Sequence, residues 1–269
     1  MPTLARHAAA LLRDRVLHAT RLHGGDLAEV VAVTLASGRE VIAKSGPAPM
    51  TEAAMLRAIA ATGTPVPEVL AADETVLVMA RLPAGGGLGG TTWADLGRLL
   101  AGLHASTGPH YGWTCDYAFG GVPIRNAASA DWPRFWSQNR LSAGAAPLPD
   151  TLRARIVRLT QLLPAILPAT PPASLLHGDL WSGNVLCAGS RVSGLIDPAC
   201  YWGHGEVDLA MLCLFAEPSA DFWDAYGRPP DGWPQRRAVY QIWPALVHLS
   251  LFGEGYRGLV ERCLAEAGA

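Results

Sequence analysis

An aspartate and an asparagine stand five residues apart in a polar stretch between two apolar pairs, Leu175-Leu176 and Val185-Leu186. Asp179 can accept the proton of an attacking hydroxyl, and the amide oxygen of Asn184 can reach a metal ion bound to phosphates. A tight loop between two short strands would aim both side chains at one point. The spacing therefore points to phosphoryl transfer, although a lone His-Gly-Asp sequence can also be a surface turn.

A second acid, Asp197, ends a short predicted strand further along the chain. The first loop has the layout of the kinase catalytic loop H-R-D-L-x-x-x-N, with Gly178 in the arginine position. Asp197 then stands where a kinase has its DFG aspartate, followed here by Pro198-Ala199. The ordered set of histidine, aspartate, asparagine and later aspartate favours a phosphotransferase site over the surface turn.

The segment before these loops contains a candidate phosphate-binding lysine. Two β-rich runs, 29–35 and 40–44, surround a Ser-Gly turn and predict an antiparallel hairpin. Lys44 ends the second run, as the lysine of the kinase V-A-I-K strand does. By itself it would be a solvated surface charge. Gly24 and Gly25 precede the hairpin and could let backbone N–H groups approach phosphates, but such a pair is more often only a turn.

Predicted helices flank the hairpin. One helix should run from Ala5 to about Thr20. A second, capped by Thr51 and running to about Ala61, carries Glu52 in its first turn. Glu52 could orient Lys44, or it could be a favourable charge at a helix N-terminus with no partner.

A strand over 75–80 leads into segment 81–90, whose glycines predict a hinge and a flexible linker. From Thr92, with Asp95 as a capping box, the pattern becomes helical. Asp131 should cap a helix whose aromatic stripe is more typical of a core than of a substrate wall. Further helices are predicted over 150–163, over 206–212, over 222–226, over 237–252 with an interruption at Pro244, and over 258–267.

This order of elements predicts an α+β, two-lobed, protein-kinase-like fold. A small β-rich lobe would cover residues 1–80, and a larger, mostly helical lobe would cover 81–269. Only residues 198–205 separate Asp197 from the next helix, which is too short for the activation segment of a protein kinase.

Composition narrows the class of protein. Half of the 269 residues are hydrophobic and 16% are charged, so a sizeable core is available. The net charge of −2 and the lack of a basic run argue against nucleic-acid binding. No apolar stretch approaches the roughly 20 residues of a membrane span, and no signal peptide is seen. Five widely spaced cysteines are interpreted as reduced thiols in a cytoplasmic protein.

The sequence resembles the fructosamine kinase (ketosamine 3-kinase) family, a branch of the aminoglycoside-phosphotransferase-like kinases. The most specific parts of the resemblance are 177–184, where Trp181 distinguishes the family from other H-G-D-x-x-x-x-N kinases, and 197–211. The resemblance implies ATP and Mg²⁺ as cofactors and phosphorylation of the 3-hydroxyl of a ketoamine, after which the unstable product releases its amine. The substrate would be a small ketoamine or a glycated lysine, and the enzyme a monomer or homodimer.

The family also implies a role for each matching residue. These roles are catalytic base for Asp179, metal ligands for Asn184 and Asp197, nucleotide contacts for Gly24, Gly25, Lys44, Glu52 and Met79, substrate contacts for His177, Trp181 and Trp202, and a brace of the catalytic loop for Asp208.

Two other functions compete with this interpretation. One is a related small-molecule kinase acting on an aminoglycoside or a choline-like substrate. Tyr201, Trp202 and His204 after the second acid suit a sugar better than a polycation. The other is a non-catalytic nucleotide-binding module, which the complete set of catalytic residue types disfavours.

Overall fold

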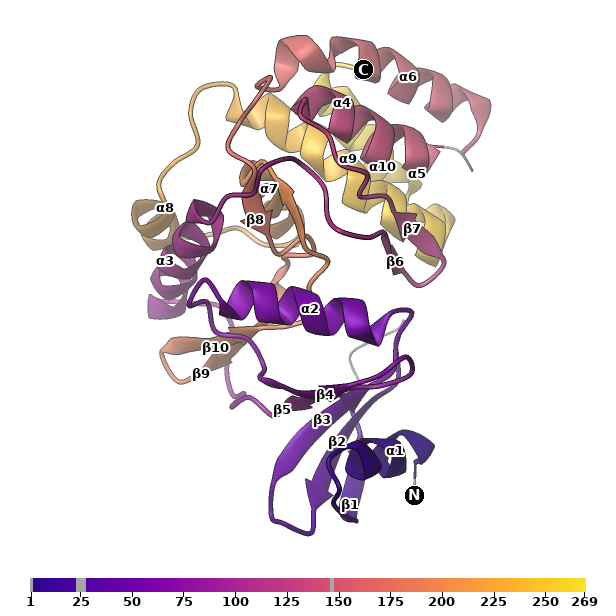
Figure 1. The fold of residues 1–269 in the computed structure, drawn as a ribbon. Coiled ribbons are helices and arrows are strands. Elements are labelled where there is room, and N and C mark those ends of the chain that lie inside the picture. Colours follow the sequence, from indigo (N-terminus) through magenta and orange to yellow (C-terminus); the bar gives the residue numbers. More distant parts are fainter. Residues whose placement is uncertain (1, 23–27, 146–147) are drawn as a thin grey trace.

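The computed structural model describes residues 2–22, 28–145 and 148–269, which form a small sheet-containing lobe and a larger helical lobe (Figure 1). The elements of the small lobe are α1 (Thr3–Leu11), β1 (Val16–Arg21), β2 (Val30–Leu35), β3 (Glu40–Lys44), α2 (Pro49–Ala60), β4 (Val69–Ala72) and β5 (Leu77–Ala80).

The remaining elements belong to the helical lobe or connect it to the sheet. The α-helices are α3 (Thr91–Ala105), α4 (Trp132–Trp136), α5 (Ala143–Ala145), α6 (Asp150–Ile166), α7 (Glu206–Phe215), α8 (Ala220–Tyr226), α9 (Trp233–Phe252) and α10 (Arg257–Ala267). The strands are β6 (Tyr117–Phe119), β7 (Val122–Ile124), β8 (Ser174–Leu176), β9 (Val185–Ala188), β10 (Arg191–Leu195) and β11 (Tyr201–Gly203). A π-helix, η1 (Ser137–Ser142), and the short 3₁₀ helices η2 (Ser182–Asn184) and η3 (Glu254–Tyr256) complete the described elements.

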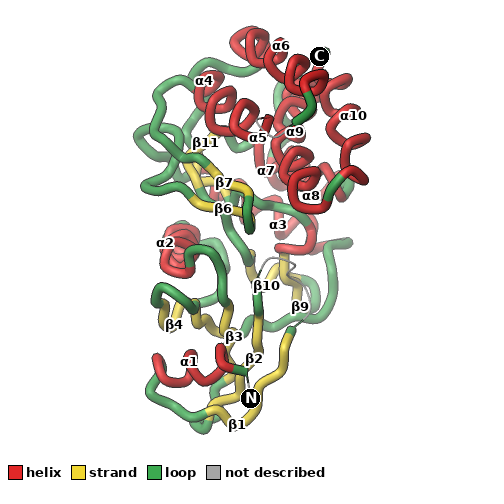
Figure 2. Tube along the Cα trace, turned by 90° about the vertical axis from the view of Figure 1, so that its right-hand side faces the viewer, coloured by secondary structure: helices red, strands yellow, loops and turns green. Residues whose placement is uncertain are grey.

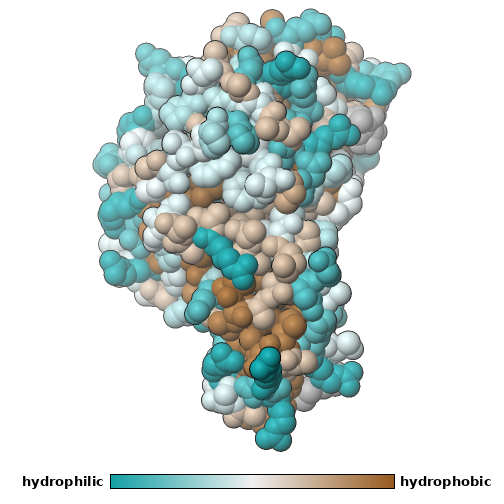
Figure 3. Space-filling model, in the orientation of Figure 1, coloured by the Kyte–Doolittle hydropathy of each residue, from teal (hydrophilic) through white to brown (hydrophobic). Residues whose placement is uncertain are grey.

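Within the described residues, five strands form an antiparallel sheet in the order β1-β2-β3-β5-β4. The predicted hairpin is confirmed, with β2 and β3 paired from Val30 opposite Lys44 to Thr34 opposite Glu40. One sheet face packs on α1 through residues such as Val33 and Val41, and the other packs on α2. Apolar residues gather over the part of the small lobe that faces the reader in Figure 3, where the edge strand β4 consists of four half-buried apolar residues.

The first predicted helix is too long. It ends at Leu11, and Arg13 has a left-handed backbone, with φ of 53°. The last part of the predicted helix, 16–20, belongs instead to the edge strand β1 paired with β2. This strand shows no alternation of buried and exposed residues, so its sequence lacks the period-2 signal of a strand.

Two predicted helix caps are also wrong. Helix α2 begins at Pro49, a residue that suits a first turn because its missing N–H has no partner there. Thr51 therefore lies inside the helix. Helix α3 begins at Thr91, and the carboxylate of Asp95 accepts a hydrogen bond from the backbone N–H of Val192 at 2.9 Å, away from its own helix.

The helical lobe packs around an aromatic core. Asp131 caps α4 by accepting the N–H of Arg134 at 2.7 Å, as predicted. Trp132, Phe135 and Trp136 are fully buried, which confirms that the aromatic stripe is core. Helix α9 continues through Pro244 because its packing on α7 and α10 outweighs one missing backbone hydrogen bond.

Two short hairpin-like pairs hold the loops that carry the candidate site. Strands β9 and β10 pair around the turn at Gly189, as predicted. Strand β11 returns to pair with β8, with Tyr201 opposite Leu176. The loop with Asp179 therefore lies between β8 and β9, and Asp197 lies between β10 and β11.

The segment that connects the lobes, 81–90, is more constrained than the flexible linker that its glycines predicted. Gly85 donates its N–H to the carbonyl of Cys187 at 2.8 Å, and Ser193 donates its hydroxyl to the carbonyl of Pro83 at 2.6 Å. Backbone groups of the connecting segment thus form hydrogen bonds with β9 and β10, and these bonds hold the segment against that strand pair. No helix in the described ranges is long and apolar enough to cross a membrane.

Candidate active site

Lys44 lies at the centre of an ion-pair network that joins the two lobes. Its Nζ donates to Oε1 of Glu52 at 2.7 Å and to Oδ1 of Asp197 at 2.8 Å. Strand β3 supplies the lysine, α2 the glutamate and the segment after β10 the second acid. Burial lowers the pKa of Lys44, but the two carboxylates raise it more, so the pKa lies above its ordinary value. The lysine remains a cation that can hold phosphate groups.

The loop between β8 and β9 brings Asp179 and Asn184 together. The side-chain amide of Asn184 donates to the backbone oxygen of Asp179 at 2.8 Å and to its carboxylate Oδ2 at 3.1 Å. Burial raises the pKa of Asp179 to about 7, with Asp197 and Asp208 adding to the rise while Asn184 and Lys44 oppose it. A carboxylate with this pKa can take a proton from a hydroxyl and release it again near neutral pH.

Asp208 supports the beginning of this loop. Its fully buried carboxylate accepts the backbone N–H of His177 at 2.7 Å and that of Gly178 at 2.9 Å, and it contacts Nε2 of His104 at 3.1 Å. Gly178 has φ of 82°, and an added Cβ would lie 2.0 Å from the carbonyl oxygen of Ala199. The glycine in the kinase arginine position is therefore required by the backbone. The geometry agrees with the predicted role of Asp208 as a brace.

The predicted substrate contact of His177 does not fit its surroundings. The side chain is completely buried, its Nε2 lies 2.9 Å from the carbonyl oxygen of Ile196, and its Nδ1 lies 3.3 Å from the backbone nitrogen of Asp179. Burial lowers its pKa, so the ring is neutral, with Nε2 as donor and Nδ1 as acceptor. His177 ties the two loops together, and a buried ring cannot touch a substrate.

Two side-chain oxygens, one in this loop and one in the segment after β10, are available for a divalent cation. The amide nitrogen of Asn184 donates to Asp179. Within the described ranges, no group donates a hydrogen bond to Oδ1 of Asn184. Oδ1 of Asp197 accepts the hydrogen bond from Lys44, and 40% of the Asp197 side chain is exposed. Its φ of 55° is unusual outside glycine and is the kind of backbone strain that collects at functional sites. Few protein ligands and hard oxygen donors suit Mg²⁺, which takes further oxygens from phosphates and water.

Sequence reasoning missed Tyr117. This half-buried residue of β6 belongs to the helical lobe, yet its hydroxyl lies 3.3 Å from Oε2 of Glu52 in the small lobe. Both views show the β6–β7 hairpin next to α2 (Figures 1 and 2). No motif marks Tyr117, since it stands 62 residues before Asp179 in a segment without a periodic pattern.

The predicted aromatic contacts differ in exposure. Trp181 leaves 38% of its surface exposed, and its ring lies against Gly183, where a Cβ would come within 2.2 Å. Trp202 is half-buried, with its ring against Gly108 and 6.1 Å from that of Trp113. Of these two tryptophans, Trp181 is the one with a large exposed surface beside the catalytic loop.

The remaining residues predicted to contact nucleotide or substrate are covered by other side chains or lie outside the described residues. Met79 pairs with Ile42 on the sheet face that carries Lys44, but α2 covers it to 5% exposure. Tyr201 is buried against Arg140, and His204 bonds the hydroxyl of Tyr240 at 2.8 Å. Tyr201 is therefore a core side chain, and the half-buried His204 is held by Tyr240, so neither is placed freely beside a sugar as the sequence suggested. Gly24 and Gly25 lie outside the described residues.

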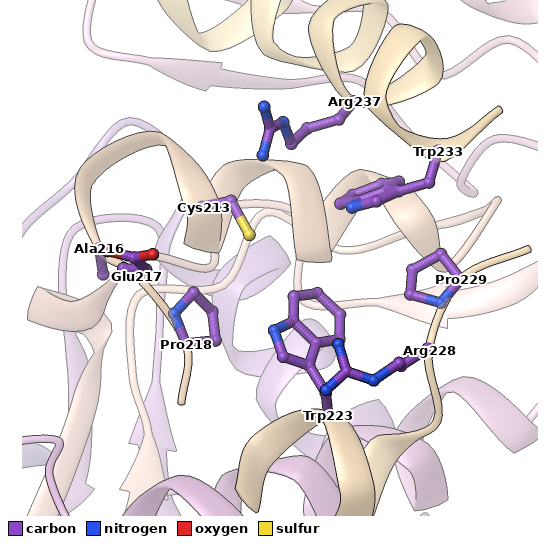
Figure 4. A pocket seen from close by; sticks show the side chains of 9 residues that line it. All are labelled: Cys213, Ala216, Glu217, Pro218, Trp223, Arg228, Pro229, Trp233 and Arg237. Carbon is purple, nitrogen blue, oxygen red and sulfur yellow. The ribbon is translucent and has the colours of Figure 1, made fainter. Parts of the chain in front are cut away.

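A separate hollow lies among the end of α7, α8 and the start of α9. It is lined by residues that include Cys213, Trp223, Trp233 and Arg237 (Figure 4). None of the residues that surround Lys44 and Asp179 contributes to it. It is therefore distinct from the candidate active site.

The two-lobed fold and the network of Lys44, Glu52, Asp179, Asn184 and Asp197 define a kinase of the protein-kinase-like fold class. A crystal structure of a Thermobifida fusca protein assigned as a fructosamine-3-kinase superposes with a TM-score of 0.89, at 28% identity, over 98% of both chains. The model of the family described as fructosamine kinase matches residues 3–267. The chain belongs to this family.

Two curated relatives agree with this assignment. A protein of Synechocystis sp. described as a probable ketoamine kinase is 34% identical over 235 residues, which cover 80% of this chain and 77% of the relative. A Thermus thermophilus protein with the same description is 33% identical over 268 residues, which cover 95% and 98%. The similarity thus extends over both lobes.

Proposed function

We propose that this chain transfers the γ-phosphate of ATP to the 3-hydroxyl of a ketoamine, either a small molecule or a glycated lysine. The observation that supports this most directly is the bond from Lys44 to both Glu52 and Asp197, next to the loop of Asp179 and Asn184. Membership of the fructosamine kinase family supports the ketoamine as acceptor.

Some of these residues would bind the phosphate donor, ATP, and Asp179 would act on the acceptor hydroxyl. Lys44, oriented by Glu52, holds the phosphates of the nucleotide by charge. Asn184 and Asp197 would hold Mg²⁺, which neutralises charge on the phosphate oxygens when bound. Asp179 orients the 3-hydroxyl and accepts its proton as the bond to phosphorus forms.

The acceptor side is expected to involve Trp181. Its indole offers a flat apolar face to the C–H surface of a sugar and an N–H donor to one of its oxygens. Phosphate on carbon 3 is a leaving group beside the carbonyl at carbon 2, so the product can release its amine without a second active site.

The proposal extends to the setting of the enzyme. A cytoplasmic location is supported by the five cysteines, which all are unpaired. We expect a monomer or homodimer that binds neither nucleic acid nor membrane, since the net charge is only −2 and no basic run occurs.

The test is ADP formation with Mg²⁺-ATP and a panel of ribulosamines, erythrulosamines and fructosamines of a blocked lysine. An aminoglycoside and choline serve as alternative acceptors, and the Asp179→Asn variant serves as the inactive control. We expect phosphorylation of at least one ketoamine, followed by release of free amine. Efficient phosphorylation of the alternatives with no ketoamine turnover would contradict the proposed acceptor.

A further inference from the structure

The hairpin formed by β6 and β7 is an arm of the helical lobe that touches the small lobe. The hydroxyl of Tyr117 donates to Glu52 at 3.3 Å, and the sulfur of Cys115, two residues before the hairpin, lies 3.8 Å from the hydroxyl of Thr51, also in α2. Both contacts involve residues in the first turn of α2, which also carries the carboxylate that accepts a hydrogen bond from Lys44. The arm is therefore placed to act on the orientation of the glutamate.

Glu52 has two oxygens and two partners. Oε1 accepts from Lys44 at 2.7 Å, and Oε2 accepts from the phenol of Tyr117 at 3.3 Å. The glutamate is only 2% exposed, so water cannot replace a lost partner easily. Burial raises the pKa of Glu52, while Lys44 and Tyr117 oppose that rise. The phenol thus favours the charged carboxylate that Lys44 needs.

The arm is held in place from within the helical lobe. The buried guanidinium of Arg140 donates to Oδ1 of Asn126 at 3.0 Å. Asn126 in turn donates its side-chain amide to the carbonyl of Cys115 at 3.1 Å and its backbone N–H to Asp116 at 2.7 Å. Tyr117 follows Asp116 in the chain, so hydrogen bonds from the helical core fix the two residues directly before the one that contacts Glu52.

We propose that Tyr117 is a positioning residue that holds Glu52, and through it Lys44, in the phosphate-binding geometry from the opposite lobe. Its hydroxyl donates to Glu52 and does not act on the acceptor. The kinetic consequences rest on the proposed kinase function, whereas the consequence for nucleotide binding can be measured without any acceptor.

The chemistry of the phenol agrees with a donor role. Burial and the nearby carboxylates of Glu52, Asp197 and Asp179 raise the pKa of Tyr117 far above its ordinary value. The hydroxyl therefore stays protonated at neutral pH. It can donate to Glu52 but cannot serve as a base.

Tyr117→Phe removes only the hydroxyl and keeps the ring that packs in the lobe. We expect the dissociation constant of a non-hydrolysable ATP analogue with Mg²⁺, measured by calorimetry, to rise about tenfold, as for one lost hydrogen bond to a charged group. The KM for ATP should rise with it, while the KM for the ketoamine should change little. The melting temperature of each variant shows that it is folded.

Tyr111→Phe is the matched control. Tyr111 donates to the carbonyl of Pro171 at 2.6 Å inside the helical lobe, so its loss should leave nucleotide binding unchanged. A second measurement uses Glu52→Gln, alone and combined with Tyr117→Phe. Because Tyr117 acts through Glu52, the double variant should bind the analogue no more weakly than Glu52→Gln alone.

Three outcomes would overturn the proposal. They are unchanged nucleotide affinity in folded Tyr117→Phe, a full additional loss in the double variant, and an effect confined to the KM for the ketoamine. If the wild-type chain phosphorylated no ketoamine, the calorimetric comparison would still decide the role of Tyr117.

Discussion

Replacing Asp208 by asparagine tests whether the catalytic loop depends on one buried carboxylate. The substitution removes the negative charge and replaces one carboxylate oxygen by an NH₂ group. That group cannot accept a hydrogen bond, so it leaves at least one backbone N–H, of Gly178 or of His177, without its acceptor. A buried N–H without a partner costs about 1–3 kcal/mol, and a hydrogen bond to a charged group contributes about 1.5–3 kcal/mol. We therefore expect Asp208→Asn to lower the free energy of unfolding by about 2–4 kcal/mol at pH 7.

The pH dependence follows from the pKa of Asp208. Burial alone would raise this pKa, but bonds and charges from His104 and His177 and the N–H of Gly178 lower it overall. A lowered pKa in the folded state means that the carboxylate stabilises the protein fully above the ordinary value, about 3.9. This contribution is lost as the pH falls below that value, so the gap between wild type and Asp208→Asn should shrink there.

Urea unfolding from pH 7 down to pH 3, followed by circular dichroism, measures this gap. The control is Asp224→Asn on the exposed side of α8, which should change the free energy of unfolding by less than about 0.5 kcal/mol. A loss in Asp208→Asn no larger than in the control would refute the bracing role. So would a large loss that does not vary with pH below 4.

Three further predictions concern the chemistry. Asp179→Asn should lower kcat by about 10²–10⁴-fold and leave nucleotide affinity nearly intact, and near-normal turnover would end its assignment as base. Asp197→Ala should abolish the gain in ATP affinity that Mg²⁺ gives the wild type, as titrated by calorimetry; a persisting gain would place the metal elsewhere. Trp181→Ala should raise the KM for the ketoamine about tenfold and that for ATP far less, and the reverse order would remove Trp181 from the acceptor site.

The site was predictable where chemistry fixes residue types at short spacing. The loop with Asp179 and Asn184 and the strand-end position of Asp197 show in the sequence because both acids follow short apolar runs. Lys44 could be linked to them only through the order of a kinase-like chain. The structure places it 2.8 Å from Asp197, across 153 residues of sequence.

What the sequence did not reveal depends on tertiary contacts. Tyr117 contacts Glu52 from the other lobe, in a segment that Arg140 and Asn126 hold by hydrogen bonds far from it in sequence. The buried setting of His177 follows from β11 folding back on β8, which no local pattern shows. Residues 16–20 were predicted as helix, but they pair with β2 as an edge strand, and their own sequence carries no strand periodicity.

The pairing of β11 with β8 has a consequence for control of the enzyme. In many protein kinases the segment after the second acid changes between ordered and disordered states, and phosphorylation selects the ordered state. Here Tyr201, Trp202 and Gly203 of that segment are hydrogen-bonded into a strand pair that also supports the catalytic loop. Loosening it would dismantle the site itself. The structure therefore gives this segment no freedom to order and disorder separately from the catalytic loop.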